Sequence, residues 1–210
     1  MNNFVITIAR GYGSGGKTVG KELAKILDVP CYDREILQMA SDESGISEEL
    51  FHQSDEKVAP SIFNIKKGVY KGGLIPPEDS DFVSDENLFN YQAKIIREKA
   101  MEESCIIIGR AADYILRTFP NTVSVNVQAP LDVCIATIVE RQSLSPKEAE
   151  RKILKINKYR SDFYSHYTGL KWNDPINYDI TLNSARIGMD RCAQAIINFA
   201  EFKLGRKITK

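Results

Sequence analysis

The chain has 210 residues and a mass of 23.7 kDa, which suits one compact domain with a small appended part better than two full domains. Apolar residues make up 43% of it and charged residues 27%, a balance that supports a hydrophobic core and excludes a disordered tail. Basic and acidic residues number 28 each, so the net charge is zero. Binding to long nucleic acids is therefore not expected, whereas a local basic cluster for small phosphorylated ligands fits this total.

The four cysteines, at positions 31, 105, 134 and 192, lie far apart and form no CxxC pair. Neither His52 nor His166 is near one of them in sequence, so a zinc site is not expected, and separate thiols are typical of a reducing compartment. The first apolar run, Phe4–Ala9, is too short for a signal peptide or a membrane span. These features predict a cytoplasmic protein that acts without a membrane.

The run Phe4–Ala9 is rich in β-branched residues and is typical of a buried strand, and apolar residues recur at helical spacing from Val19 to Asp28. Between them, Gly11–Thr18 fits the phosphate-loop pattern G-x-x-x-x-G-K-[ST]. A chance match in a chain of this length has odds of about one in a hundred. The strand before the loop and the helix after it lower these odds further.

The loop residues expected to hold nucleotide phosphates are Gly11, Gly13, Ser14, Gly15, Gly16, Lys17 and Thr18. The glycines let backbone N–H groups surround an anion at the start of a helix. Lys17 is expected to reach the outer phosphates, and the Thr18 hydroxyl to help hold Mg²⁺. The loop thus predicts ATP and Mg²⁺ as cofactors, and the alternative is an ordinary glycine-rich turn.

A second apolar stretch, Pro30–Tyr32, leads to Asp33 and Arg34 and then to a helical pattern. If the stretch is a strand, both charged side chains lie at its carboxyl end, where parallel α/β sheets bind ligands. There Asp33 would assist the metal or accept a proton from an attacking hydroxyl, and Arg34 would contact the substrate. Asp33 suits equally well the role of a cap for the following helix.

Residues 54–84 contain glycine and proline pairs and an acidic run, with weak periodicity between them. This composition predicts a long surface insertion, either a cover over the acceptor site or a plain loop. A helix is expected over Asp85–Glu103, with apolar residues on its inner face.

The run Cys105–Ile108 predicts another buried strand, and Arg110 follows it through Gly109. We expect Arg110 to bind a substrate phosphate with bidentate hydrogen bonds, because Gly109 permits close approach of the backbone. The alternative is a surface arginine at the start of a helix over Ala111–Arg117. No carboxylate ends this strand directly, so Asp113 and Asp33 are the candidates for the metal shell.

Two more strands, Thr122–Val127 and Tyr178–Ser184, and a helix over Leu131–Gln142 complete an alternation of strands and helices. The sequence therefore predicts an α/β fold of the P-loop NTPase type. We expect a doubly wound parallel sheet of about five strands with helices on both faces, in a single domain over residues 1–210.

A helical lid is expected over about residues 143–168. It opens with Ser145-Pro-Lys-Glu, a capping box with proline at the first helical position. Arg151, Lys155 and Lys158 share one face of this helix, which suits contact with a triphosphate and is equally typical of a solvated helix. Arg160 falls on the apolar side, so its side chain points inward or the helix breaks there.

The order of these segments resembles the cytidylate-kinase-like family, within the P-loop nucleoside monophosphate kinases. The segments that carry the resemblance span nearly the whole chain: Gly11–Thr18, Tyr32–Glu35, Ile107–Arg110, Ala129–Pro130, Tyr178–Asp179 and Asn183–Ser184. The resemblance implies an ATP-dependent kinase that transfers the γ-phosphate to a nucleoside monophosphate, CMP or dCMP, or to a related small molecule. It also implies a substrate-side segment after the second strand and a lid before the last strand.

By this resemblance Arg110 matches the arginine that holds the phosphate of the acceptor, and Arg160 matches the last arginine of the lid motif R-x-x-x-D-x-x-R. With Lys17 and Asp33 they form the expected catalytic set. The expected substrate contacts are Arg34, Arg110, Asp113 and Asn157.

Several positions depart from the family pattern. Asn157 and Ile153 replace the Asp and the first Arg of the lid motif, Ala111 replaces the Asp of GRD, and Cys134 replaces an arginine of many relatives. Lys155 and Lys158 are the candidates to replace the lost lid charges, although a lysine lacks the guanidinium fork. Two alternatives therefore stay open beside cytidylate phosphorylation: a kinase of a non-nucleotide metabolite, and a nucleotide-binding sensor with little turnover.

Overall fold

The computed structural model describes residues 3–57, 70 and 72–209. Within these residues five parallel strands form one sheet in the order β2-β3-β1-β4-β5. The strands are β1 Val5–Arg10, β2 Cys31–Tyr32, β3 Cys105–Ile108, β4 Thr122–Gln128 and β5 Ile180–Asn183. The predicted α/β fold with a five-stranded parallel sheet is confirmed.

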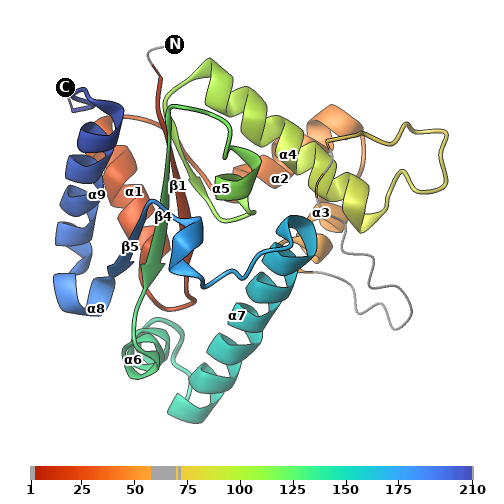
Figure 1. Ribbon diagram of the computed structural model, residues 1–210. Helices are drawn as coiled ribbons and strands as arrows, with labels where there is room; N and C mark the ends of the chain where they lie inside the picture. The colour runs from red at the N-terminus through yellow and green to blue at the C-terminus, as the bar shows by residue number, and fades with distance from the viewer. Residues whose placement is uncertain (1–2, 58–69, 71, 210) are drawn as a thin grey trace.

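Helices cover both faces of this sheet (Figure 1). On one face α1 (Gly16–Leu27) and α9 (Met189–Leu204) enclose Ile6 and Ile8 of β1. On the other face α4 (Asp85–Glu102) and α5 (Ala112–Ile115) cover Val5, and α2 (Glu35–Ser44) and α3 (Glu48–Ser54) pack on α4. Successive side chains of β1 thus enter opposite apolar layers, which is why this strand is buried along its whole length.

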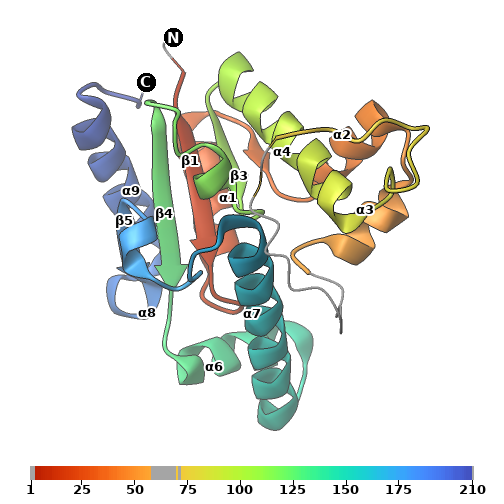
Figure 2. The ribbon, with the colours of Figure 1, turned by 45° about the vertical axis from the view of Figure 1, so that its right-hand side comes forward.

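The carboxyl ends of the strands face α6 (Leu131–Gln142) and the long α7 (Pro146–Thr168) (Figure 2). The predicted capping box fixes the start of α7, since the Ser145 hydroxyl accepts the Glu148 N–H and the Glu148 carboxylate accepts the Ser145 N–H. The helix continues without a break past Arg160. Of the two alternatives for that residue, the inward orientation is therefore the one that the structure adopts.

Several predicted elements differ from the structure by one or two residues at an end, and two of these differences have a local cause. The helix expected over Ala111–Arg117 is only Ala112–Ile115, because Gly109, Arg110 and Ala111 have left-handed backbone with φ of 75°, 55° and 52°. The last strand, expected over Tyr178–Ser184, is Ile180–Asn183. The Asn183 side chain caps the short α8 (Ser184–Ile187), which Gly188 separates from α9. A 3-10 turn, η1, spans Pro175–Asn177.

The predicted insertion over 54–84 falls partly on residues 58–69 and 71, which lie outside the described residues. Its described part from 72 to 84 consists of turns and extended chain beside α4. Asn87 of α4 holds this part, because its side-chain amide donates to the carbonyls of Ile75 and Phe82 and accepts the Ile75 N–H. Ser84 then caps α4 by accepting the Asn87 N–H, so the helix begins at Asp85 as expected.

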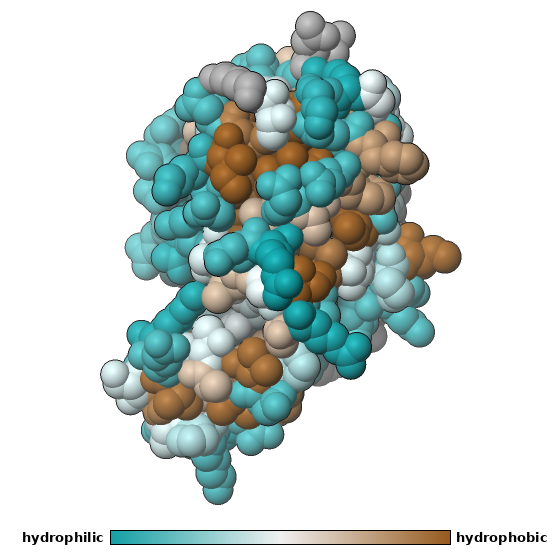
Figure 3. Space-filling view, turned by 90° about the vertical axis from the view of Figure 1, so that its left-hand side faces the viewer, coloured by the Kyte–Doolittle hydropathy of each residue, from teal (hydrophilic) through white to brown (hydrophobic). Residues whose placement is uncertain are grey.

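The face that carries α9 is mainly hydrophilic, with hydrophobic side chains in small separate groups (Figure 3). Such scattered apolar surface is usual for a protein face exposed to water. No helix of the described residues combines the length and the apolar character that crossing a membrane requires.

Candidate active site

The glycine-rich loop between β1 and α1 is built as an anion cradle. Gly15 caps α1 without a side-chain hydrogen bond among the described residues, so the first N–H groups of the helix are left for a ligand. The Ser14 hydroxyl is used inside the loop, where it donates to the carbonyls of Gly11 at 2.9 Å and Val127 at 2.8 Å. Gly13 has φ of 86°, and a Cβ there would lie 2.9 Å from the Cys134 carbonyl oxygen, so only glycine suits this position.

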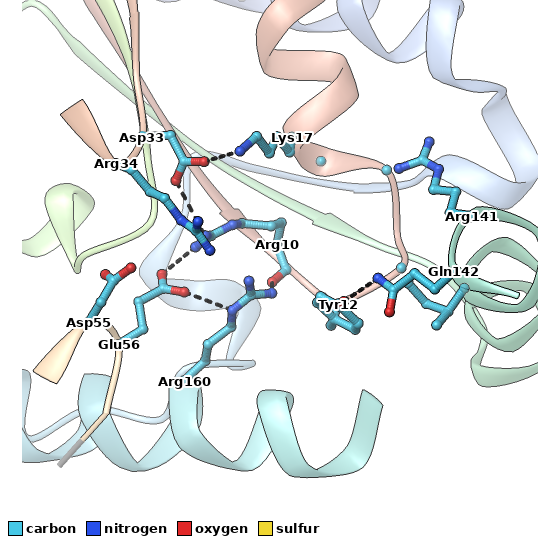
Figure 4. Close-up of a pocket in the computed structure, with 15 residues that line it drawn as sticks. Arg10, Tyr12, Lys17, Asp33, Arg34, Asp55, Glu56, Arg141, Gln142 and Arg160 are labelled. Carbon is cyan, nitrogen blue, oxygen red and sulfur yellow. Dashed lines mark hydrogen bonds and ion pairs between the residues drawn. The ribbon is translucent and has the colours of Figure 1, made fainter. Parts of the chain in front are cut away.

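Lys17 and Thr18 end the loop at the first turn of α1. The Lys17 ammonium donates to Asp33 Oδ2 at 2.5 Å, across the pocket shown in Figure 4. The Thr18 hydroxyl accepts a hydrogen bond from Arg141 Nη2 at 3.3 Å. Arg141 comes from α6 and was not among the predicted site residues. It brings a guanidinium to the place where the loop would receive phosphates.

Asp33 does not cap α2, because the cap residue is Arg34 and no side-chain bond caps that helix end. Its carboxylate accepts instead from Lys17 and from Arg110 Nη1, the latter at 3.3 Å. Burial by itself raises the pKa of the Asp33 carboxyl, but the Lys17 hydrogen bond and the arginine charges outweigh burial and hold the pKa below its ordinary value. Asp33 is therefore ionised at neutral pH.

Arg110 is buried, with a 1% exposed side chain, beneath the ends of β2 and β3. Its guanidinium contacts Asp33 and lies 3.0 Å from Asp55 Oδ1, and it also donates to the Ile108 carbonyl at 3.2 Å. Among the described residues its Nε has no partner. Arg110 thus faces carboxylates rather than the open pocket. The two left-handed residues Arg110 and Ala111 make this turn a costly conformation of the kind that concentrates at functional sites.

A second group of buried charges meets at Glu56, in the chain just after α3. Arg10 Nη1 contacts Glu56 Oε1, and Arg160 Nε donates to Glu56 Oε2 at 2.9 Å. Arg160 also donates to the Arg10 carbonyl at 3.1 Å, which joins α7 to the end of β1. Burial alone raises the pKa of Glu56, yet the charges of Arg10 and Arg160 hold the pKa far below its usual range.

The sequence analysis missed Arg10 and Glu56. Arg10 carries the signal that identified Asp33 and Arg110, a charged residue at the end of a buried strand. Glu56 carries no comparable signal, because it lies in a stretch whose composition predicts only a surface insertion.

A pocket of about 260 Å³ lies between the phosphate loop, the end of β2, α6 and α7. Its described lining includes the loop glycines together with Tyr12, Ile138 and Gln142. It also includes the charged side chains Arg10, Lys17, Asp33, Arg34, Asp55, Glu56, Arg141 and Arg160. The structure thus brings together Lys17, Asp33, Arg34 and Arg160 from three separate segments of the chain (Figure 4).

The lysines expected to contact the nucleotide lie elsewhere. Lys158 pairs with Asp162 at 2.6 Å on the exposed face of α7, and Lys155 lies over the Tyr159 ring. Neither lines the pocket. The helical period explains this placement, since residues two and five positions before an inward Arg160 point away from it.

Asn157, three positions before Arg160, lies on the same side of α7 and accepts the Tyr12 N–H at 2.8 Å. The residue that stands at the family's aspartate position therefore ties α7 to the phosphate loop. It is not among the residues that line the pocket.

Asp113, the other predicted metal or substrate contact, lies on α5 and accepts the Tyr164 hydroxyl at 2.6 Å. It does not line the phosphate-loop pocket. The described residues contain no cluster of three or more His, Cys, Asp or Glu side chains arranged for a metal. A Mg²⁺ site of the phosphate-loop kind needs no such cluster, because Mg²⁺ is held there largely by phosphates, waters and a loop hydroxyl, and Thr18 stands at the position of that hydroxyl.

The sheet order, the loop that ends in Lys17-Thr18 and the charged strand ends define the class of P-loop kinases. The model of the cytidylate kinase-like family matches residues 5–186. The chain belongs to this family, as the order of its motifs predicted.

Solved structures support the same fold. The chain is 25% identical to an uncharacterized protein from Eubacterium ventriosum, with a TM-score of 0.69 over 95% of this chain and 99% of the other. It is 15% identical to shikimate kinase from Bacteroides thetaiotaomicron, with a TM-score of 0.54 over 94% and 98%. It is also 15% identical to TT1252 from Thermus thermophilus, with a TM-score of 0.52 over 94% of this chain and 98% of the other. No curated protein sequence matches this chain.

Burial raises the pKa of Asp113 to about 6, so the folded protein binds this proton more tightly than the unfolded chain does. The contribution of Asp113 to the free energy of unfolding therefore falls as the pH rises from about 4 to 6 and stays lost above that. We expect Asp113→Asn to flatten this part of the pH profile and to gain about 1–3 kcal/mol relative to wild type above pH 6. Urea unfolding between pH 4 and 8 measures this. Asp42→Asn, on the exposed side of α2, is the control, and parallel profiles for Asp113→Asn and wild type would contradict the expectation.

Proposed function

We propose that this protein is an ATP- and Mg²⁺-dependent phosphotransferase that acts on a small-molecule acceptor. The observation that carries the proposal is the contact between Lys17 of the phosphate loop and Asp33, which follows β2 at the carboxyl end of the same sheet. Arg160 of α7 lines the same pocket. The four cysteines are unpaired, which fits the reducing cytoplasm as its location.

The donor side consists of the loop N–H groups, Lys17, Thr18 and Arg141. Lys17 has a 53% exposed side chain, so it is free to turn from Asp33 towards a phosphate. Arg141 already contacts the Thr18 hydroxyl and would add a guanidinium to the phosphates. When bound, Mg²⁺ supplies neutralisation of the outer phosphates of ATP.

The transfer joins an acceptor oxygen to the γ-phosphorus, while the bond between that phosphorus and the leaving oxygen of ADP breaks. If the acceptor is a hydroxyl group, its proton passes to Asp33, which is ionised and within hydrogen-bond reach of Lys17. Arg160 and Lys17 offset the negative charge on the transferred group. The protein mainly positions the reactants and neutralises charge, which is the usual division of labour in phosphoryl transfer.

CMP and dCMP are the first acceptors to consider, because the chain belongs to the cytidylate kinase-like family. A hydroxylated non-nucleotide metabolite is the second candidate, and Asp33 favours it. A phosphate acceptor is already deprotonated and needs no base, whereas a hydroxyl acceptor benefits from one. Two positions where relatives carry arginine also serve packing here, since Cys134 and Ile153 are buried in the cluster between α6 and α7.

A coupled ADP-release assay with ATP·Mg²⁺ separates these candidates. The acceptors are CMP, dCMP, the other nucleoside monophosphates and a set of hydroxylated carboxylic acids. Shikimate is included because a shikimate kinase shares this fold. Turnover confined to cytidylates identifies the family acceptor, and turnover confined to hydroxy acids identifies the metabolite kinase. ATP binding without turnover on any acceptor contradicts the proposal and identifies a sensor.

Lys17→Ala is expected to weaken ATP binding by about tenfold to a hundredfold, because it removes charge-assisted hydrogen bonds to phosphate. The fold should persist, since the Lys17 side chain is half exposed. The ATP-induced rise in melting temperature measures the effect. Lys21→Ala, one turn further along α1 and exposed, is the matched control. An equal ATP-induced rise in Lys17→Ala and wild type would refute this role for Lys17.

Asp33→Asn tests the base. With a hydroxyl acceptor we expect kcat to fall by about a hundredfold or more while ATP binding stays within a few-fold of wild type. With a phosphate acceptor, the variant should change the acceptor KM more than kcat, because only binding is affected. Unchanged kcat and unchanged KM would show that Asp33 has neither role.

A further inference from the structure

The Glu56 carboxylate lies in a cradle made by three separate segments. Arg10 at the end of β1 contacts Oε1, and the backbone N–H of Arg110, in the turn after β3, approaches the same oxygen at 3.3 Å. Arg160 of α7 donates to Oε2 at 2.9 Å. Both carboxylate oxygens are therefore held, in the way that a bound anionic ligand would be held.

The backbone around this cradle has a costly shape on both sides. Glu56 has φ of 51°, a left-handed conformation that side-chain-bearing residues rarely adopt. Across the cradle, Gly109 has φ of 75°, and a Cβ there would lie 2.0 Å from Arg10 Nη1 and 2.1 Å from Glu56 Oε1. Gly109, which has no side chain, thus leaves room beside the backbone for a guanidinium and an anion to make contact.

The ion-pair network around the cradle has more positive than negative side chains. In the described network the cations Arg10, Lys17, Arg110 and Arg160 face the carboxylates Asp33, Asp55 and Glu56. One positive charge is left over with Glu56 in place, and two are left over without it. Arg10 and Arg160 are both largely buried, with side chains 10% and 12% exposed, and Glu56 is their shared carboxylate partner. The site therefore attracts an anion whenever Glu56 leaves it.

The cradle adjoins the reacting groups. Arg10 reaches both Glu56 and, at 4.0 Å, Asp33, and Asp33 in turn contacts Lys17. A molecule with an anionic group in the cradle would present a neighbouring oxygen to the Asp33 side of the pocket (Figure 4).

We propose that this cradle is the subsite for the anionic group of the acceptor and that Glu56 occupies it as a competing anion from within the protein. The inference rests on the proposed function and names its substrate class. The acceptor carries a carboxylate or a phosphate in addition to the oxygen that is phosphorylated. A neutral compound cannot displace Glu56, so Glu56 selects for anionic acceptors.

Competition of this kind has a measurable consequence. The apparent dissociation constant of an anion equals its intrinsic value divided by the fraction of molecules in which Glu56 has left the cradle. Neutralising Glu56 removes the competitor and the repulsion it exerts. We expect Glu56→Gln to bind inorganic phosphate about tenfold more tightly than wild type does.

The test is calorimetric titration of the full chain with inorganic phosphate at constant ionic strength, in the absence of ATP. Wild type, Glu56→Gln and the double variant Glu56→Gln with Arg160→Leu are compared. All three keep the phosphate loop itself, and wild type and Glu56→Gln differ only in the cradle, so the comparison of these two isolates the cradle. Asp55→Asn is the matched control, because it removes the same charge from the adjacent residue, which pairs with Arg110 and not with Arg10 or Arg160. Melting temperatures establish that each variant is folded before the titration.

The proposal stands if Glu56→Gln gains affinity, the double variant loses the gain and Asp55→Asn shows less than about a third of it. It is overturned if Glu56→Gln binds both phosphate and acetate like wild type, or if Asp55→Asn gains as much affinity as Glu56→Gln, which would indicate a general effect of charge. Repeating the titration with acetate distinguishes the two chemistries, since a gain for acetate alone assigns the cradle to carboxylates. Failure of the kinase proposal shows separately, as ATP binding without turnover.

Discussion

A charge removed from water has to be compensated, and this requirement organises the catalytic end of the molecule. Arg110 is only 1% exposed, so its guanidinium depends on Asp33 and Asp55, and these carboxylates come from segments far away in the sequence. Glu56 and Arg160 extend the same network to α7. The end of β1, the end of β2, the chain after α3 and the middle of α7 are thus joined by ion pairs. The apolar clusters hold the rest of the sheet and its helices.

Several unfavourable backbone conformations lie beside the same network of ion pairs. The left-handed residues Arg110 and Ala111 follow β3, and Glu56 follows α3, so each unusual conformation adjoins the ion pairs. Such conformations cost of order 1–3 kcal/mol each and persist only where surrounding contacts over-determine them. Here the buried charges provide those contacts. Stability is therefore lower at the candidate site, while the sheet core, with Ile6 and Ile8 wholly buried, supplies the stability that offsets this cost.

The fold could be predicted because its sequence signals are local and periodic. Buried β-branched strands, a phosphate loop and a capping box can each be recognised from a few consecutive residues. For Arg160 the helical period predicted either an inward side chain or a break in the helix, and the structure has the inward side chain in an unbroken helix. The period of the same helix, followed one step further, would have turned Lys155 and Lys158 outward. Glu56 was out of reach, since its role depends on three segments that meet only in the folded chain. Charged residues that pair across the fold have no fixed spacing in the sequence, so no sequence pattern identifies them.

Packing explains two of the departures from the family pattern, at positions 153 and 134. Ile153 is buried between α6 and α7, and Cys134 lies against Gly13, where a longer charged side chain would have to displace the phosphate loop. Positive charge enters the pocket by other routes, from Arg141 at the end of α6 and from Arg10 at the end of β1. Arg10 and Arg160 are buried to a similar extent, and Glu56 holds both of them in place without a ligand. Under the proposed function, the acceptor end of the site is therefore organised around the end of β1, and its specificity depends on which anions can take the position of Glu56.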